Sequence, residues 1–184
     1  MTSNDKPLVA ILMGSDSDLP TMSETAKMLD RFGIAYATRI TSAHRSPKRT
    51  HELVATLEAG GVEVFVVGAG LAAHLAGVVA SIKAKPVIGV PMGRGSLQGV
   101  DALYSTVQMP GGVPVATMAI GRHGAKNAGV LAAQILALQD EGLKDRLVAF
   151  KEELERSVEE KDRKLTAELR VAAGAVGELT REGK

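Results

Sequence analysis

The stretch Thr41-Ser42-Ala43-His44-Arg45-Ser46-Pro47 joins two sequence patterns of different period, and this junction indicates the fold. The residues before it, 34–40, form a short β-rich run that is typical of a strand. The residues after it, 47–60, carry apolar side chains at helical spacing. The stretch is therefore a strand-to-helix turn. In an open α/β sheet such turns lie at the carboxyl ends of the strands, where ligands bind.

Two side chains of this turn suggest a chemistry. Arg45 is a permanent cation whose forked donors match a phosphate group. His44 can exchange a proton near neutral pH. Our working hypothesis is that Arg45 anchors an anionic ligand and that His44 acts on it.

The rest of the chain repeats the strand-then-helix order. An apolar run without alternation opens the chain, and such runs are typical of parallel strands that are buried on both faces. Five units in series predict an α/β fold with a doubly wound, mainly parallel sheet of flavodoxin-like type and helices on both faces. We expect one catalytic domain over residues 1–140, and the five strands are expected at residues 8–13, 34–40, 62–67, 86–91 and 115–120.

The loop after the first strand has two interpretations. Ser15, Ser17 and Asp18 lie in it, and Ser17 or Asp18 is expected to cap the next helix. A capped turn explains these residues without a ligand. An anion site at a helix N-terminus, with the carboxylate holding ribose hydroxyls, explains them equally well.

The third strand is followed by a second histidine. Gly68-Ala69-Gly70 predicts a turn, and a helix of small side chains is expected to begin at Leu71. His74 lies on this helix, where a lone histidine is often a satisfied core residue. Its place at a strand's carboxyl end favours a functional role. Further on, residues 92–99 predict a Gly-rich mobile loop that could serve as a lid.

Composition excludes several classes of function. The 184 residues are 45% hydrophobic and 23% charged, as in an ordinary globular protein. A net charge of +1 and 3% aromatic residues argue against nucleic-acid binding and against a polybasic membrane surface. The chain has no cysteine, so it has no disulfide, no thiolate catalysis and no cysteine-ligated metal. A cytoplasmic location is compatible with this composition.

Neither a membrane span nor a signal peptide is expected. Residues 64–82 lack Asp, Glu, Lys and Arg, but the run contains His74 and several glycines. A buried strand, a turn and a buried helix explain it better than a membrane helix does. The N-terminus carries Asp5 and Lys6 and then enters a strand pattern, unlike a signal peptide.

The C-terminal region differs in character. From residue 141 onward, apolar residues recur every three or four positions among many charges, which predicts an amphipathic helix with a narrow apolar stripe. We expect residues 141–184 to form a helical extension that packs on the domain or on a neighbouring subunit.

Four motifs together resemble the PurE family. They are Gly14-Ser15-x-Ser17-Asp18, Ser42-Ala43-His44-Arg45-x-Pro47, Gly68-Ala69-Gly70-x-Ala72-Ala73-His74-Leu75 and Gln108-Met109-Pro110-x-Gly112-x-Pro114-Val115. They occur in the family's order, and the resemblance covers roughly residues 8–140. The resemblance implies a three-layer α/β/α sandwich, a homo-octamer, and no metal, ATP or organic cofactor. It also implies transfer of a carboxylate from the exocyclic nitrogen of an aminoimidazole ribotide to its ring carbon, in purine biosynthesis.

The resemblance also assigns site residues. The catalytic histidine falls on His44. The remaining positions are expected to bind the phosphorylated ribonucleotide, with Ser17, Ser42 and Arg45 on its phosphate. These substrate-binding positions are Ser15, Ser17, Asp18, Ser42, Ala43, Arg45, Ala69, Gly70, Leu71 and His74.

Two branches of the family fit to different degrees. One rearranges the N-carboxy ribotide, and the other carboxylates the aminoimidazole ribotide directly with CO2. The pairing of His44 with Arg45 and the presence of His74 resemble the mutase branch. The family commonly has glycine at position 71 and proline at position 76, where this chain has Leu71 and Ala76. A non-catalytic nucleotide-phosphate sensor is the remaining alternative, although it would give His44 no task.

Overall fold

The structure is a computed structural model that describes the backbone of residues 6–179 and the side chains of residues 6–169. It divides the chain into two compact units, Met1–Leu143 and Lys144–Lys184. The expectation that no signal peptide precedes the first strand falls in part on residues 1–5, which lie outside the described residues.

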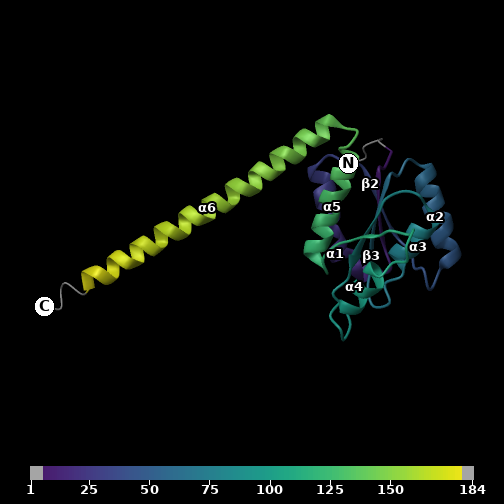
Figure 1. The fold of residues 1–184 in the computed structure, drawn as a ribbon, viewed down its shortest axis with the longest axis horizontal. Coiled ribbons are helices and arrows are strands. Elements are labelled where there is room, and N and C mark those ends of the chain that lie inside the picture. The colour runs from purple at the N-terminus through teal and green to yellow at the C-terminus, as the bar shows by residue number, and fades with distance from the viewer. Residues whose placement is uncertain (1–5, 180–184) are drawn as a thin grey trace. The chain divides into compact units, whose positions relative to one another are not determined.

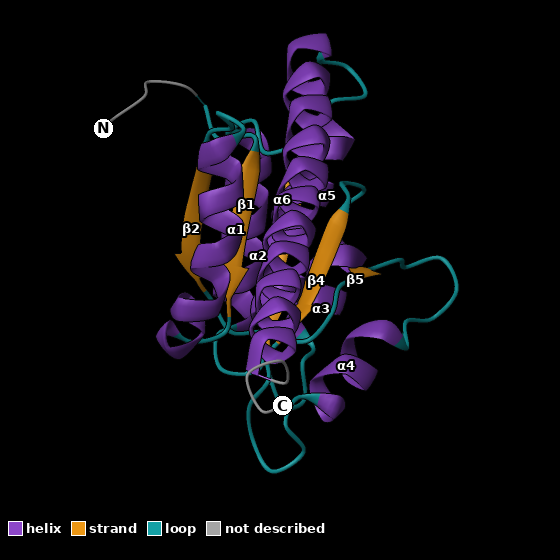
Figure 2. Ribbon diagram, turned by 90° about the vertical axis from the view of Figure 1, so that its left-hand side faces the viewer, coloured by secondary structure: helices purple, strands orange, loops and turns teal. Residues whose placement is uncertain are grey.

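The first unit is built on a sheet of five parallel strands in the order β2-β1-β3-β4-β5 (Figures 1 and 2). This order confirms the predicted doubly wound sheet of flavodoxin-like type. The strands are β1 (Val9–Met13), β2 (Tyr36–Ile40), β3 (Val64–Ala69), β4 (Val87–Pro91) and β5 (Ala116–Thr117).

The sheet has a switch point between β1 and β3. From β1 the chain moves outward to β2, and it then returns to place β3 on the other side of β1. In the register, Met13 pairs with Ile40 on one side and with Gly68 on the other. The loops that follow these three strands therefore leave the sheet side by side, which is where open α/β sheets bind ligands.

Helices cover both faces of the sheet, as the three-layer prediction requires. On one face lie α1 (Leu19–Arg31) and α5 (Arg122–Leu136) (Figure 1). On the other lie α2 (Pro47–Ala59), α3 (Leu75–Ile82) and α4 (Val100–Val107), whose inward side chains share one buried cluster with β3. Every residue of β1 and β3 is buried, which explains why neither strand alternates between polar and apolar residues.

Three predicted elements differ in the structure. The third strand was expected over residues 62–67 but covers Val64–Ala69, so Gly68 and Ala69 lie in the strand and not in a turn. The helix expected from Leu71 begins only at Leu75, because Leu71 has a φ of 56° and a left-handed residue cannot continue a right-handed helix. The fifth strand was expected over residues 115–120 but covers only Ala116–Thr117. Beyond it the chain still follows β4, with hydrogen bonds from Met118 N to Gly89 O and from Gly121 N to Pro91 O.

The C-terminal region forms one amphipathic helix, α6 (Glu141–Leu179). The carboxylate of Asp140 accepts a hydrogen bond from Leu143 N at 2.9 Å and so caps its first turn. Over the described residues, no helix is both long enough and apolar enough to cross a membrane.

Helices α1 and α5 approach each other closely at Gly129. A methyl group added there would lie 2.7 Å from Met28 Cβ and 3.0 Å from Thr25 O. Beside it, the buried hydroxyl of Thr25 donates a 2.7 Å hydrogen bond to Ala125 O. The contact fixes α1 against α5. The N-terminus of α1 follows the loop that contains Ser15 and Asp18.

We predict that Gly129→Ala destabilises the protein by about 1–2 kcal/mol. Overpacking costs roughly 1–3 kcal/mol, and the better helix propensity of alanine offsets up to about 1 kcal/mol of that. Urea unfolding of the variant and the wild type measures the difference. The matched control is Gly111→Ala, because nothing lies within 4 Å of the added methyl group. An equal or higher stability of Gly129→Ala would show that the helices are not tightly packed there.

Candidate active site

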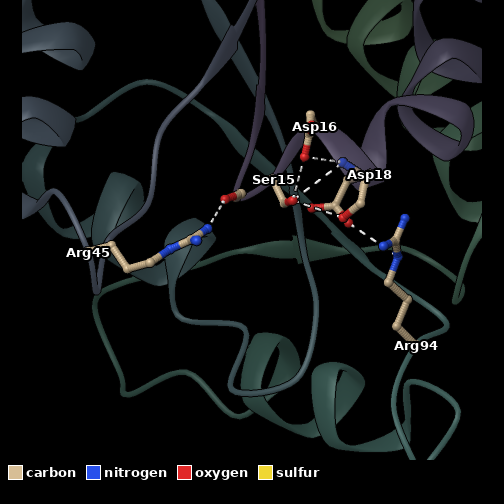
Figure 3. Close-up of polar contacts among 7 residues, drawn as sticks. Ser15, Asp16, Asp18, Arg45 and Arg94 are labelled. Carbon is tan, nitrogen blue, oxygen red and sulfur yellow. Dashed lines mark hydrogen bonds and ion pairs between the residues drawn. The ribbon is translucent and has the colours of Figure 1, made fainter.

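The loop after β1 forms a small hydrogen-bonded network (Figure 3). Ser17 Oγ donates to Ser15 Oγ at 2.8 Å, and Ser17 N donates to Asp16 Oδ1 at 2.9 Å. Ser15 caps a single 3-10 turn, Asp16–Asp18, that precedes α1. The side chain of Asp18 makes no capping hydrogen bond to α1. Asp18 is the N-cap residue of α1, as the sequence predicted for Ser17 or Asp18, but the capping side chain is that of Ser15, which caps the preceding 3-10 turn.

Asp18 is a buried carboxylate opposite an arginine. Its side chain is 7% exposed, and its Oδ1 lies 3.5 Å from Nε of Arg94 (Figure 3). Burial raises the pKa of Asp18 above its usual value, and the Arg94 cation opposes that rise. A hydrogen bond to the backbone of Ser15 also lowers the pKa of Asp18. Arg94 thus balances part of the cost of burying this charge.

Arg45 crosses from the loop after β2 to the loop after β1. Its Nη2 donates to Gly14 O at 2.9 Å (Figure 3). Its backbone N–H donates to Ser42 Oγ at 3.2 Å. The bond to Gly14 engages one of the five N–H donors of the guanidinium. The side chain is exposed and borders the same hollow as the serines of the first loop.

The two histidines meet across the switch point. His44 Nε2 lies 2.6 Å from His74 Nδ1, and the rings are edge to face, with centroids 4.8 Å apart. Two N–H groups cannot face each other at that distance, so at most one of the two contacting nitrogens carries a proton. Both residues are exposed, so the alternative that His74 is a core histidine is wrong. One hydrogen bond therefore joins the two rings.

A cavity of about 530 Å³ lies among these loops. That volume is in the range of small-molecule sites. All eleven residues named as site residues from the sequence line it, and they come from three loops. The loop after β1 gives Ser15, Ser17 and Asp18, the loop after β2 gives Ser42, Ala43, His44 and Arg45, and the end of β3 with its loop gives Ala69, Gly70, Leu71 and His74. A smaller hollow of about 370 Å³ borders the other side of the histidine pair.

Comparison with known proteins identifies the relatives of this chain. A family model described as AIR carboxylase matches residues 8–157. The chain belongs to the AIR carboxylase (PurE) family. It is 52% identical over 159 residues to N5-carboxyaminoimidazole ribonucleotide mutase of Thermotoga maritima, covering 86% of this chain and 92% of that protein. It is 49% identical over 162 residues to the mutase of the same name from Pyrococcus horikoshii, covering 88% and 90% respectively.

Solved structures in this family share the fold. The crystal structure of Treponema denticola PurE superposes with a TM-score of 0.79 at 34% identity, covering 86% of this chain and 98% of that one. The PurE resemblance found in the sequence is thereby confirmed, together with the α/β fold class.

Five residues that line the cavity were not named as site residues from the sequence: Gly14, Ala72, Leu75, Arg94 and Gly95. Arg94 is the one among them with a charged side chain. Arg94 reaches the cavity from the loop after β4, together with Gly95. The sequence did carry a signal, because the Gly-rich segment 92–99 follows a strand's carboxyl end and contains one cation. Among the described residues no group of three or more His, Cys, Asp or Glu could hold a metal ion. The polar groups of this site are therefore the serines, Asp18, the two arginines and the two histidines.

We predict that Arg94→Ala raises the pKa of Asp18 further, because it removes the cation that lowers this pKa. The folded protein then holds the proton of Asp18 to a higher pH than the unfolded chain does. The free energy of unfolding consequently falls with rising pH, and this fall covers a wider pH interval above 3.8, the usual pKa of an aspartate side chain. A carbon-13 NMR titration of the aspartate carboxyl groups measures the change directly.

The matched control is Arg94→Lys, which keeps a positive charge and should give a smaller rise. An unchanged or lowered pKa of Asp18 in Arg94→Ala would contradict the pairing of these two side chains.

Proposed function

We propose that this chain is an N5-carboxyaminoimidazole ribonucleotide mutase, an isomerase of purine biosynthesis. It converts N5-carboxyaminoimidazole ribonucleotide to 4-carboxy-5-aminoimidazole ribonucleotide. The observation that carries this proposal is the match over most of both chains to relatives of that name, at about half identity. The cavity at the switch point, with His44 and Arg45 on its wall, supplies a site for the reaction.

The cavity offers distinct partners for the parts of a ribotide. The Arg45 guanidinium, with the hydroxyls of Ser17 and Ser42, suits the phosphate, because a forked cation and hydroxyl donors match its oxygens. The carboxylate of Asp18 suits the ribose hydroxyls, which donate to an ionised acid. Arg94 favours the ionised form of Asp18 and offers a second cation for the migrating carboxylate.

The small side chains after β3 suit the carboxylate transfer. Cleavage of the N–CO2 bond leaves CO2 and an amino group, and the ring carbon must then capture the same CO2 before it escapes. Ala69 and Gly70 line the cavity with little bulk and no competing side-chain donors. A confined site of this kind gains from proximity, an effect that reaches about 7–11 kcal/mol in favourable cases.

His44 moves the proton in this proposal. A protonated His44 gives its proton to the exocyclic nitrogen as the N–CO2 bond breaks. After the ring carbon has bonded to CO2, that carbon still carries a hydrogen, and His44 removes it to restore the aromatic ring. His44 is protonated again at the end of the reaction. Overall, the carboxylate has moved from the exocyclic nitrogen to the ring carbon, and a proton has moved from the ring carbon to that nitrogen. General acid–base help of this kind contributes about 10² to 10⁴ in rate.

His74 is placed to assist. Because its Nδ1 contacts His44 Nε2 at 2.6 Å, it can accept or return a proton without movement of either ring. It also fixes the orientation of the His44 ring relative to the cavity. These two functions make His74 a positioning residue for His44.

We propose further that the protein acts as a homo-octamer in the cytoplasm without a metal or organic cofactor. The resemblance to the PurE family supports these points, and the cysteine-free composition is compatible with a reducing compartment.

We predict that the purified protein converts the N-carboxy ribotide without added bicarbonate and shows much lower activity with aminoimidazole ribotide plus bicarbonate. Absorbance of the 4-carboxy product measures both reactions. The second assay matters because the matching family model is described as AIR carboxylase. Activity only in the second assay would make the chain a direct carboxylase. Tight nucleotide binding with no turnover in either assay would favour the sensor alternative.

We predict that His44→Asn lowers turnover by at least about 10²-fold and leaves the dissociation constant for the product nearly unchanged. Asparagine preserves much of the shape and polarity but cannot transfer the proton. Product formation and isothermal titration measure the two quantities separately.

The matched control is His51→Asn, because His51 is exposed on α2 and lies outside the cavity lining. Its turnover should equal that of the wild type. Wild-type turnover in His44→Asn would exclude His44 as the acid–base group.

For Arg45→Ala we predict mainly a higher dissociation constant for the product and a smaller effect on turnover, since this change removes a phosphate-binding cation.

A further inference from the structure

Helix α6 carries an apolar stripe that the proposed reaction does not use. Its exposed members are Leu154, Val158, Leu165 and Leu169, which are 43%, 66%, 56% and 62% exposed. Leu154 and Leu165 are eleven residues apart, and so are Val158 and Leu169. Eleven residues make just over three turns, so the stripe runs nearly straight along the helix. The family model ends at residue 157, so three of these four side chains lie beyond the residues that the model matches.

The stripe has an internal two-fold symmetry. If a second copy of α6 lies antiparallel to the first and the two cross between residues 161 and 162, Leu154 faces the partner's Leu169. In the same arrangement Val158 faces the partner's Leu165. Every apolar side chain of the exposed stripe then meets an apolar side chain. This is the self-complementary pattern of an isologous two-fold contact.

The charges fit the same arrangement. Lys161 lies within the stripe and faces the partner's Asp162 at the crossing point. Lys164 forms an ion pair with Glu160 of its own helix, with Nζ 2.6 Å from Oε1. In the antiparallel pair it also lies beside the partner's Glu160. A parallel pair in register would instead place Lys161 against the partner's Lys161 in the centre of the apolar contact, where like charges are unfavourable.

We propose that α6 is a self-association surface that pairs antiparallel with α6 of a second copy of this chain, centred on Lys161 and Asp162. A second copy of α6 is the partner that fits this stripe, because one helix supplies both the apolar side chains and the charges that match them. The pairing is independent of the reaction assigned to the cavity.

Disulfide trapping in the full-length protein tests this pairing. The chain has no cysteine, so introduced thiols are the only ones present. In the double variant V158C/L165C, each cysteine faces its mate on the partner, and mild oxidation should convert most of the protein to covalent dimers on a non-reducing gel. The single variants V158C and L165C should stay monomeric on that gel. Identical positions in an antiparallel pair lie about seven residues, roughly 10 Å, apart along the axis, beyond disulfide reach.

The matched control is R156C/R163C. These two positions have the same spacing, are exposed, and lie on the opposite face of the helix. Their cross-linking should be at least tenfold lower. Absence of dimers in V158C/L165C, equal cross-linking in the control, or dimers of the single variants, which indicate a parallel pair, would each overturn the proposal.

Discussion

Parallel strands bring all their carboxyl ends to one edge of a sheet, and the rest of this structure depends on that constraint. Because Met13 lies level with Ile40 and Gly68 in the register, three loops far apart in sequence open beside one another. The 2.6 Å contact between His44 and His74 spans two of these loops, and the bond from Arg45 to Gly14 O also joins two. The backbone hydrogen bonds of the sheet thus determine which side chains can meet.

The balance of charge around Asp18 shows how the same edge tolerates a buried acid. Burial alone would favour the protonated form. The guanidinium of Arg94 and a backbone hydrogen bond at Ser15 favour the charged form. The site therefore presents a carboxylate together with two arginines, an arrangement suited to a ligand that is both hydroxylated and anionic.

Much of this could be predicted from the sequence, for identifiable reasons. Continuous apolar runs predicted the buried strands, and motifs at their carboxyl ends predicted the eleven residues that meet at one cavity. The misses have physical causes. No periodicity reveals that Leu71 adopts a left-handed backbone, so the predicted helix starts four residues before the observed one. Arg94 was missed because side-chain pairing with Asp18 depends on loop geometry and not on spacing. The fifth strand was drawn too long because the chain follows β4 without a regular ladder.

The backbone at Leu71 also has a consequence for ligand discovery. Its isobutyl group is 56% exposed on the cavity wall, and its backbone has a φ of 56°, a conformation that glycine adopts more readily than leucine. An inhibitor whose apolar arm rests on this side chain would gain contact area that a glycine-bearing enzyme cannot offer. Selectivity between close relatives can thus be sought at the one lining residue where the backbone conformation favours glycine and the chain supplies leucine.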